Sequence, residues 1–187
     1  FNPFYREAGV EIGFFAYKWL YASASAGSNL SDYTSNYTKD PTYTARVEIT
    51  PQLGEVGLMF GGSFAAVKLG GASDTLNTNM YGGFFGFGYD EFSLLAEYDM
   101  SNDLLSPDVK SSMIMLEAAY GVLTGLDAVV RYDRIDYIAD TDKDEISRLI
   151  FGFEFHPYSF IEVRPQYRLV MEDPSVDNDS FVLQLHF

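Results

Sequence analysis

The chain has 187 residues, about the size of one domain, and 47% of them are apolar while 17% are aromatic. This aromatic content excludes a disordered chain. The formal net charge of -15 repels phosphate backbones and argues against a nucleic-acid partner. The chain has no cysteine, which excludes disulfides and thiolate metal sites but leaves the redox compartment open.

The start of the chain predicts one strand with an irregularity. From residue 9 to about residue 25, apolar side chains recur at every second position, which predicts a strand. Lys18 then falls on the apolar face, which predicts a bulge or a change of register there. The longest uncharged apolar stretch, residues 56–67, is too short to span a membrane as a helix.

The rest of the chain predicts about nine more strands. Residues 56–68 and 80–89 are rich in glycine, and interleaved aromatic residues favour strands there. Pro165 lacks a main-chain donor and predicts a bulge or a gap in the pairing of its strand. Segments with strict two-residue alternation, which is incompatible with helices, cover residues 43–49, 94–100, 113–120, 126–133, 148–156, 161–169 and 181–187.

The connections between these segments alternate in length. An up-and-down order of about ten strands, with turns at one rim and loops at the other, explains this alternation. The short connections are residues 51–55, 90–91, 122–125 and 157–159, and the long polar ones are residues 27–42, 69–78, 101–109, 138–145 and 171–179.

The polar face of the strands carries most of the arginines, together with carboxylates. An enclosed polar interior favours guanidinium groups paired with carboxylates, and in lipid only a closed sheet pairs every main-chain amide. We therefore expect an all-β fold, a transmembrane antiparallel up-and-down β-barrel of about ten strands that forms one domain over residues 1–187. The side chains expected to line its lumen are Arg46, Glu48, Glu97, Asp99, Glu117, Arg131, Asp133, Arg148, Glu154, Glu162, Arg164 and Arg168.

Aromatic residues cluster toward the ends of the predicted strands. Such positions are typical of the aromatic girdles that lie at both membrane interfaces. The residues that support this expectation are Tyr98, Tyr120, Tyr132, Phe155, Tyr167 and Phe187.

The last seven residues alternate in apolar character and end on a carboxy-terminal Phe. In this the chain resembles the Gram-negative bacterial outer-membrane β-barrel proteins, including porins, without matching one subfamily. The resemblance covers nearly the whole chain as a pattern and the terminus as a motif. It implies that Phe181, Leu183, Leu185 and Phe187 form the signal read by the barrel-assembly machinery. It also implies an outer-membrane location, both termini in the periplasm, and contacts with membrane lipid and lipopolysaccharide.

Several functions remain open at this point. Because ten strands lie between a side-chain-filled barrel and an aqueous channel, we expect a constricted lumen. A porin-like barrel would pass small solutes and favour cations, since carboxylates outnumber arginines on the polar face. A structural barrel would anchor or sheath another envelope protein. The chain also fits the carboxy-terminal part of a larger barrel, and any export signal is expected to have been removed. A soluble ligand-binding barrel shows the same alternation but is disfavoured.

Enzymatic chemistry would depend on His156 and His186, because the chain has only two histidines. His156 is expected in a tight turn without a carboxylate to orient its ring, and His186 is expected on the lumen face. We therefore predict structural roles for both, and no enzyme activity, cofactor or metal site. Residues 140–145 carry alternating carboxylates but lack the glycine and spaced glutamate of a calcium loop, so they predict a solvated acidic loop.

Overall fold

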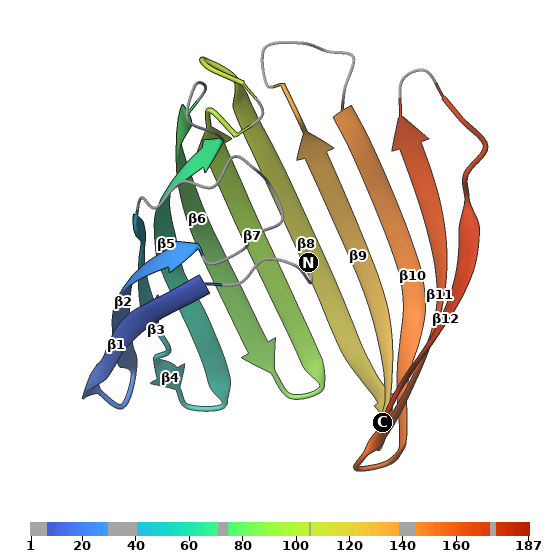
Figure 1. The fold of residues 1–187 in the computed structure, drawn as a ribbon. Coiled ribbons are helices and arrows are strands. Elements are labelled where there is room, and N and C mark those ends of the chain that lie inside the picture. The colour runs from blue at the N-terminus through green and yellow to red at the C-terminus, as the bar shows by residue number, and fades with distance from the viewer. Residues whose placement is uncertain (1–6, 30–40, 71–74, 105, 139–144, 173–174) are drawn as a thin grey trace.

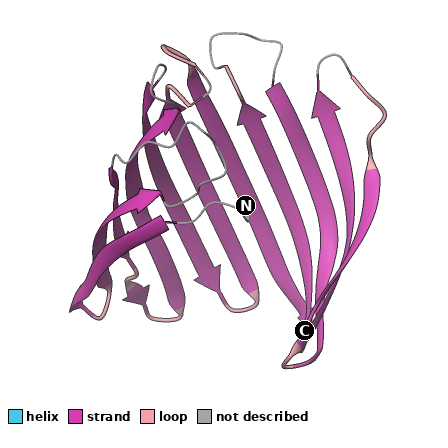
Figure 2. Cartoon of the chain, in the orientation of Figure 1, coloured by secondary structure: helices cyan, strands magenta, loops and turns pink. Residues whose placement is uncertain are grey.

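The computed structural model describes residues 7–29, 41–70, 75–104, 106–138, 145–172 and 175–187. In these ranges the chain forms strands joined by turns and loops (Figure 2). No helix in this part of the chain has the length and apolar character needed to cross a membrane.

The strands form one antiparallel sheet that follows the order of the chain (Figure 1). The short strand β4 pairs with β5 outside the main path, and the other strands pair consecutively. Their bounds are β1 (Glu7–Tyr17), β2 (Leu20–Asn29), β3 (Pro41–Ile49), β4 (Gln52–Leu53), β5 (Val56–Gly70), β6 (Thr75–Tyr89), β7 (Phe92–Asn102), β8 (Lys110–Leu123), β9 (Leu126–Asp136), β10 (Glu145–Tyr158), β11 (Ile161–Glu172) and β12 (Ser180–His186).

The all-β, antiparallel up-and-down order is confirmed, but the expected number of about ten strands is wrong, because the sheet has twelve. The segment predicted as one strand from residue 9 to 25 is a hairpin of β1 and β2, in which Tyr17 pairs with Leu20. Lys18 therefore lies in a turn with Trp19. This turn contains no Gly, Asn, Asp or Pro, so its sequence carries none of the usual turn signals. The second additional strand is β4, which forms inside the connection after β3.

The sheet is strongly curved but is not closed into a barrel. Within the described residues, β1 pairs only with β2 and β12 pairs only with β11. Figure 1 shows the two edge strands at opposite sides of the open sheet. The expectation of a closed barrel is therefore wrong for this structure. Alternating side chains specify the two faces of a sheet, and they do so equally in an open and a closed one.

The two rims of the sheet differ in the length of their connections. One rim, called the short-turn rim, holds tight turns at residues 18–19, 90–91, 124–125 and 159–160 and the connection that contains β4. The other rim, called the long-loop rim, holds the longer connections, such as the one from β7 to β8 (Figure 1). The other connections follow the predicted alternation of short and long. The exception is the connection from β5 to β6, which spans only residues 71–74 because both strands extend into the predicted loop 69–78, and which is shorter than the connection from β3 to β5 at residues 50–55.

The two ends of the sheet lie at different rims. The main path contains eleven strands besides β4. Because this number is odd, β1 begins at the long-loop rim while β12 ends at the short-turn rim (Figure 1). Ten strands would have placed both ends of the sheet at one rim.

Pro165 interrupts the pairing of β11 on one side, as its sequence predicted. Between β10 and β11 the register runs from Gly152 opposite Gln166 to Phe155 opposite Val163, and the positions between them are not paired. On the other side, Pro165 stays in register with Leu183 of β12. The prediction of a gap is confirmed, and the alternative of a bulge at this proline is not needed.

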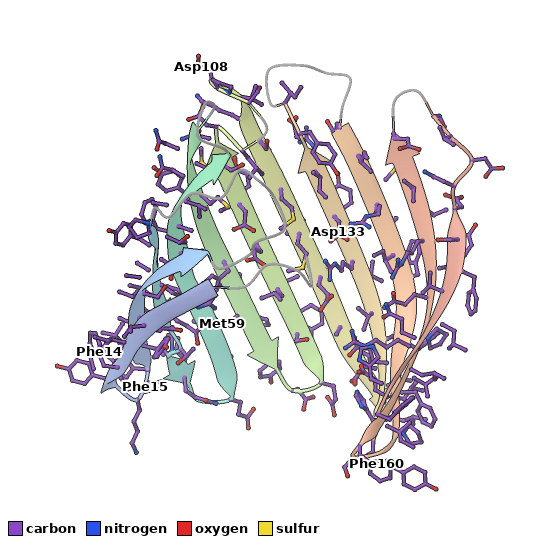
Figure 3. All side chains as sticks on the ribbon, viewed as in Figure 1. Phe14, Phe15, Met59, Asp108, Asp133 and Phe160 are labelled. Atoms are coloured by element: carbon purple, nitrogen blue, oxygen red, sulfur yellow. The ribbon has the colours of Figure 1, made fainter. Side chains whose placement is uncertain are left out.

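The register separates the side chains into two faces. We call the concave face the inner face and the convex face the outer face; Figure 3 shows Asp133 on the inner face and Phe14 on the outer face. The outer face exposes large apolar side chains, among them Phe151 and Leu183, which are 42% and 56% exposed. The buried apolar side chains of the described residues all belong to the inner face: Phe84, Met115, Val129 and Ile150.

Candidate functional site on the inner face

The register brings all twelve residues of the predicted polar lumen onto the inner face. Arg46 is opposite Ser63, Ser63 is opposite Gly82, and Gly82 is opposite Asp99, so these residues share one face. In the same way, Arg148 is opposite Asp133. The twelve come from six strands: Arg46 and Glu48 from β3, Glu97 and Asp99 from β7, Glu117 from β8, Arg131 and Asp133 from β9, Arg148 and Glu154 from β10, and Glu162, Arg164 and Arg168 from β11. Sequence alternation therefore identified a single polar surface.

Asp133 lies at the centre of one group of charges on this face. Its Oδ1 atom accepts a hydrogen bond of 2.6 Å from Nε of Arg131, and its Oδ2 atom lies 3.6 Å from Nη2 of Arg148. Glu117 on β8 lies 3.9 Å from Arg131. The Asp133 side chain is only 6% exposed, so two guanidinium groups balance its charge in place of water. We call these four residues the Asp133 cluster.

Glu162 lies at the centre of a second group, near the short-turn rim. Its Oε1 atom accepts a hydrogen bond from Nε of Arg164, whose Nη2 atom lies 3.1 Å from Oε1 of Glu154. Nε2 of His156 lies 3.9 Å from Oε1 of Glu162, and Nδ1 of His186 lies 3.5 Å from Oε2 of the same carboxylate. We call these five residues the Glu162 cluster.

The environment of His156 differs from the sequence prediction. Strand β10 continues to Tyr158, so the tight turn lies at residues 159–160 and His156 is part of the strand. Its main-chain N–H donates to the carbonyl of Gly125. The expectation that no carboxylate stands near its ring is wrong, because Glu162 lies within ion-pair distance. Continuing the register that pairs Phe155 with Val163 by one position places His156 opposite Glu162, and single-strand alternation does not reveal this register.

The described residues include one group able to hold a metal ion. One ligand atom from each of Glu154, His156 and Glu162 lies within 4.8 Å of the others. His186 approaches the same glutamate from β12. The acidic residues 140–144, considered above for calcium, lie outside the described residues.

The inner face of β5 and β6 is built from small residues, and we call it the glycine region. A Cβ atom at Gly61 would lie 2.2 Å from the carbonyl oxygen of Val47 and 2.5 Å from the Phe84 ring. The Phe84 ring occupies the space that glycine leaves, and the Arg46 guanidinium lies 4.3 Å from the centre of this ring. Arg46 also donates a 2.9 Å hydrogen bond to Glu48. Glycine is therefore required here by close packing.

Two of the cavities on the inner face include predicted lumen residues from opposite parts of the sheet. One, of about 390 Å³, is lined by charged residues of the Asp133 and Glu162 clusters together with Arg168 and Gln184. The other, of about 600 Å³, lies over β1 to β9 and is lined mainly by hydroxyl, methionine and aromatic side chains, for example Ser63, Met80, Met113 and Tyr137. Sequence reasoning predicted the charged lining of the first cavity and Arg46 and Asp99 in the second, but it missed the uncharged residues that form most of the second cavity.

Two arginines depart from the predicted pairing. Arg168 donates to the amide oxygen of Gln166 and contacts no carboxylate among the described residues. Arg134 was not predicted as part of a pair, yet its Nη2 atom lies 2.7 Å from Oε2 of Glu145. This pair lies on the outer face next to the long-loop rim, where β9 ends and β10 begins. The sequence does indicate that Arg134 and Arg131 lie on opposite faces, because they are three positions apart on one strand.

Exposed aromatic side chains surround the short-turn rim. We call them the aromatic rim: Tyr17, Trp19, Tyr89, Phe92, Tyr120, Tyr158 and Phe160. Tyr17 stacks on Trp19, and Tyr158 stacks on Phe160, which Figure 3 shows at this edge. In the turn between Tyr89 and Phe92, a hydrogen bond with Asp90 raises the pKa of Glu91 above its usual range.

The expected girdle residues are only partly placed at a rim. Tyr120 and Phe155 lie close to the short-turn ends of β8 and β10. Tyr98, Tyr132 and Tyr167 lie in the middle of their strands on the outer face, so the expectation that they lie toward strand ends is wrong. Alternation identified the correct face for them, but strand ends could not be located accurately because several strands extend beyond the alternating segments.

The carboxy-terminal apolar residues share the outer face of an edge strand. Phe181, Leu183 and Leu185 alternate along β12 in register with Tyr167, Pro165 and Val163 of β11. Phe187 follows the end of the strand and is 98% exposed. These residues therefore form one accessible apolar row.

Comparison of the chain with protein-family models, with curated proteins and with solved structures found no match.

Proposed function

We propose that this chain is an integral outer-membrane β-sheet protein whose outer face contacts lipid and whose inner face borders water. The observation that carries the proposal is the separation of the two faces, with large apolar side chains exposed outside and the charged clusters inside. For a protein in water, exposing such a continuous apolar surface costs free energy. Lipid contact removes that cost. The backbone pairing within the sheet satisfies the main-chain amides in hydrocarbon except along the free edges of β1 and β12, which a further strand or chain would have to pair.

The aromatic rim supports the same proposal. Trp and Tyr are enriched where a membrane meets water, because their rings are apolar and their polar atoms reach the interface. The rim combines Trp19 with several tyrosines and phenylalanines at one end of the sheet. We propose that the short-turn rim faces the periplasm and that the apolar row on β12 is the part read by the barrel-assembly machinery. Lipopolysaccharide would be met at the long-loop rim.

Within this setting we propose a non-enzymatic, porin-like role for small cations. Of the twelve inner-face residues predicted from the sequence, seven are acids and five are arginines, so 5 - 7 leaves a formal charge of -2. A polar path lined by excess carboxylate favours cations. The Asp133 cluster specifically favours a second candidate, a structural barrel component, because its paired side chains fill space across β8, β9 and β10.

The lipid-facing assignment can be tested with two neighbouring cysteine variants, since the chain has no native cysteine. Spin labels at Tyr98→Cys on the outer face and at Glu97→Cys on the inner face of β7 lie at nearly the same depth. In lipid bilayers we expect oxygen to relax the label at 98 most strongly and a water-soluble nickel chelate to relax the label at 97. Equal access of the nickel chelate to both labels would contradict a membrane location.

The role of the inner face is tested by conductance. The full chain, reconstituted in a planar lipid bilayer under a KCl gradient, is expected to give channels whose reversal potential shows preference for K⁺ over Cl⁻. Arg131→Gln is expected to increase this preference because it removes a positive charge from the inner face. A folded protein that gives no channels would favour the structural role.

A further inference from the structure

We propose that Glu154, His156, Glu162 and His186 form a binding site for one divalent transition metal ion of the Zn²⁺ class. The site lies on the inner face of β10, β11 and β12, near the short-turn rim. It does not depend on the membrane role proposed above, because the four residues are brought together by the pairing of these three strands alone.

The strand register creates the site. Glu162 of β11 is directly opposite His186 of β12. On its other side, the register that pairs Phe155 of β10 with Val163 places His156 next to Glu162. The chain contains two histidines, separated by thirty positions, and both imidazole rings approach the same carboxylate. Glu154 lies one inward position before His156 on β10, and one ligand atom each of Glu154, His156 and Glu162 lies within 4.8 Å of the others. His186, beside Glu162, adds a second nitrogen donor to these three.

The distances suit coordination by a small metal ion. With bonds of about 2.0 to 2.1 Å to the metal, ligand atoms in a tetrahedral zinc site lie about 3.3 Å apart. Nδ1 of His186 is 3.5 Å from Oε2 of Glu162, and Nε2 of His156 is 3.9 Å from Oε1. Small side-chain rotations are therefore enough to bring these atoms onto one ion.

The donor types select the class of metal. Imidazole nitrogen together with carboxylate oxygen suits Zn²⁺, Cu²⁺ and Ni²⁺, whereas Ca²⁺ and Mg²⁺ prefer oxygen ligands throughout. The side chains of His156 and His186 are 42% and 54% exposed, so an ion can reach them from the inner face. Glu162 is 15% exposed, which limits the water that competes for it.

Arg164 sets the charge and the orientation of the site. It contacts both carboxylates, with Nη2 3.1 Å from Glu154 and Nε bonded to Glu162. Each carboxylate has a second oxygen that these contacts leave available, and in Glu162 this oxygen is the one beside His186. With both imidazoles neutral, two carboxylates and one guanidinium give a net charge of -1, which attracts a cation. Arg164 thus acts as a positioning residue that holds the carboxylates in place.

The test is metal titration of the full-length chain in detergent micelles after treatment with a chelator. Isothermal titration with ZnCl₂ is expected to show one Zn²⁺ per chain, with CaCl₂ and MgCl₂ giving no binding at the same concentrations. His186→Ala and His156→Ala are each expected to weaken Zn²⁺ binding by about tenfold or more, since even outer-shell changes cost that much. Gln184→Ala, which changes the neighbouring inner-face position of β12, is the matched control and is expected to bind as the parent does.

Cobalt gives a readout that a structural role would not produce. Co²⁺ added to the parent chain is expected to develop the intense visible absorption of a four-coordinate ion with nitrogen ligands, and this absorption is expected to be lost in the His156→Ala/His186→Ala double variant. Circular dichroism checks that the double variant keeps its sheet. The proposal is overturned if the folded parent shows no saturable Zn²⁺ binding, or if the folded double variant binds Zn²⁺ with the affinity of the parent.

Discussion

On β5 and β6 the inner face is built from small residues, whereas from β9 to β11 it is built from long charged ones. In the glycine region, the missing Cβ of Gly61 lets the Phe84 ring lie close to the backbone. In the Asp133 and Glu162 clusters, side chains reach across neighbouring strands and pair their charges. Curvature brings side chains on the concave face of a sheet close together. The glycine region relieves this crowding by lacking side chains, whereas the charged clusters fill the space with side chains of opposite charge in contact.

The comparison predicts the largest loss of stability in the charged half. Asp133→Ala leaves Arg131 and Arg148 without their nearest counter-charge on the inner face. We expect the free energy of unfolding to fall by about 3 kcal/mol, the lower end for breaking a buried pair, because both arginines are partly exposed. Urea unfolding in detergent micelles, followed by Trp19 fluorescence, measures this. A change below about 0.5 kcal/mol, typical of a surface site, would contradict a structural role for the cluster.

The glycine region is expected to respond to added volume instead. Gly61→Val places a side chain against the Val47 carbonyl and the Phe84 ring, and the carbonyl belongs to a paired strand that cannot move freely. Overpacking of this kind costs about 2 kcal/mol. Gly88→Val on β6 is the control, because a Cβ at Gly88 would meet no atom within 4 Å. Equal unfolding midpoints for the two variants would show that close packing does not explain Gly61.

Arg46 belongs to both kinds of packing, since its guanidinium lies over Phe84 and bonds to Glu48. Its side chain is 45% exposed, so we expect Arg46→Ala to cost only about 1 kcal/mol. Arg46→Lys keeps the positive charge but loses the flat group that covers the ring, and it is expected to recover less than half of this loss. Full recovery by lysine would assign the effect to charge alone. Unfolding at two salt concentrations separates the two contributions.

The smallest effect is expected at Arg168, which has no carboxylate partner among the described residues. Arg168→Gln is expected to change the free energy of unfolding by less than about 0.5 kcal/mol. Arg164→Gln on the same strand removes contacts with two carboxylates and is expected to cost clearly more. Comparable losses for these two variants would mean that charge pairing does not distinguish the arginines of β11.

The division into an inner and an outer face could be predicted from the sequence because it depends only on the two-residue period of a strand. Arg148 and Phe151 were assigned to opposite faces from their positions alone, and the register agrees. The hairpin at Lys18 and Trp19 was missed because its turn lacks the residues that normally adopt turn conformations. Closure of the sheet was predicted wrongly because it depends on the pairing of its edges, which alternation does not encode.

The contacts within the candidate site could not be predicted for a similar reason. Glu162 was recognised as a polar inner-face residue, but its two histidine neighbours come from other strands. His186 reaches it through the register between β11 and β12, and His156 reaches it through the register between β10 and β11. A single strand pattern contains neither register. His156 was therefore assigned to a turn, although it lies in β10.

The odd number of strands in the main path determines the relative direction of its two edge strands, β1 and β12. Since consecutive strands alternate in direction, the first and the eleventh point the same way. Direct pairing of β1 with β12 would therefore be parallel in an otherwise antiparallel sheet. One more strand between them, ascending from the short-turn rim, would instead satisfy the outward-facing amides and carbonyls of both borders with the same geometry as every other pair.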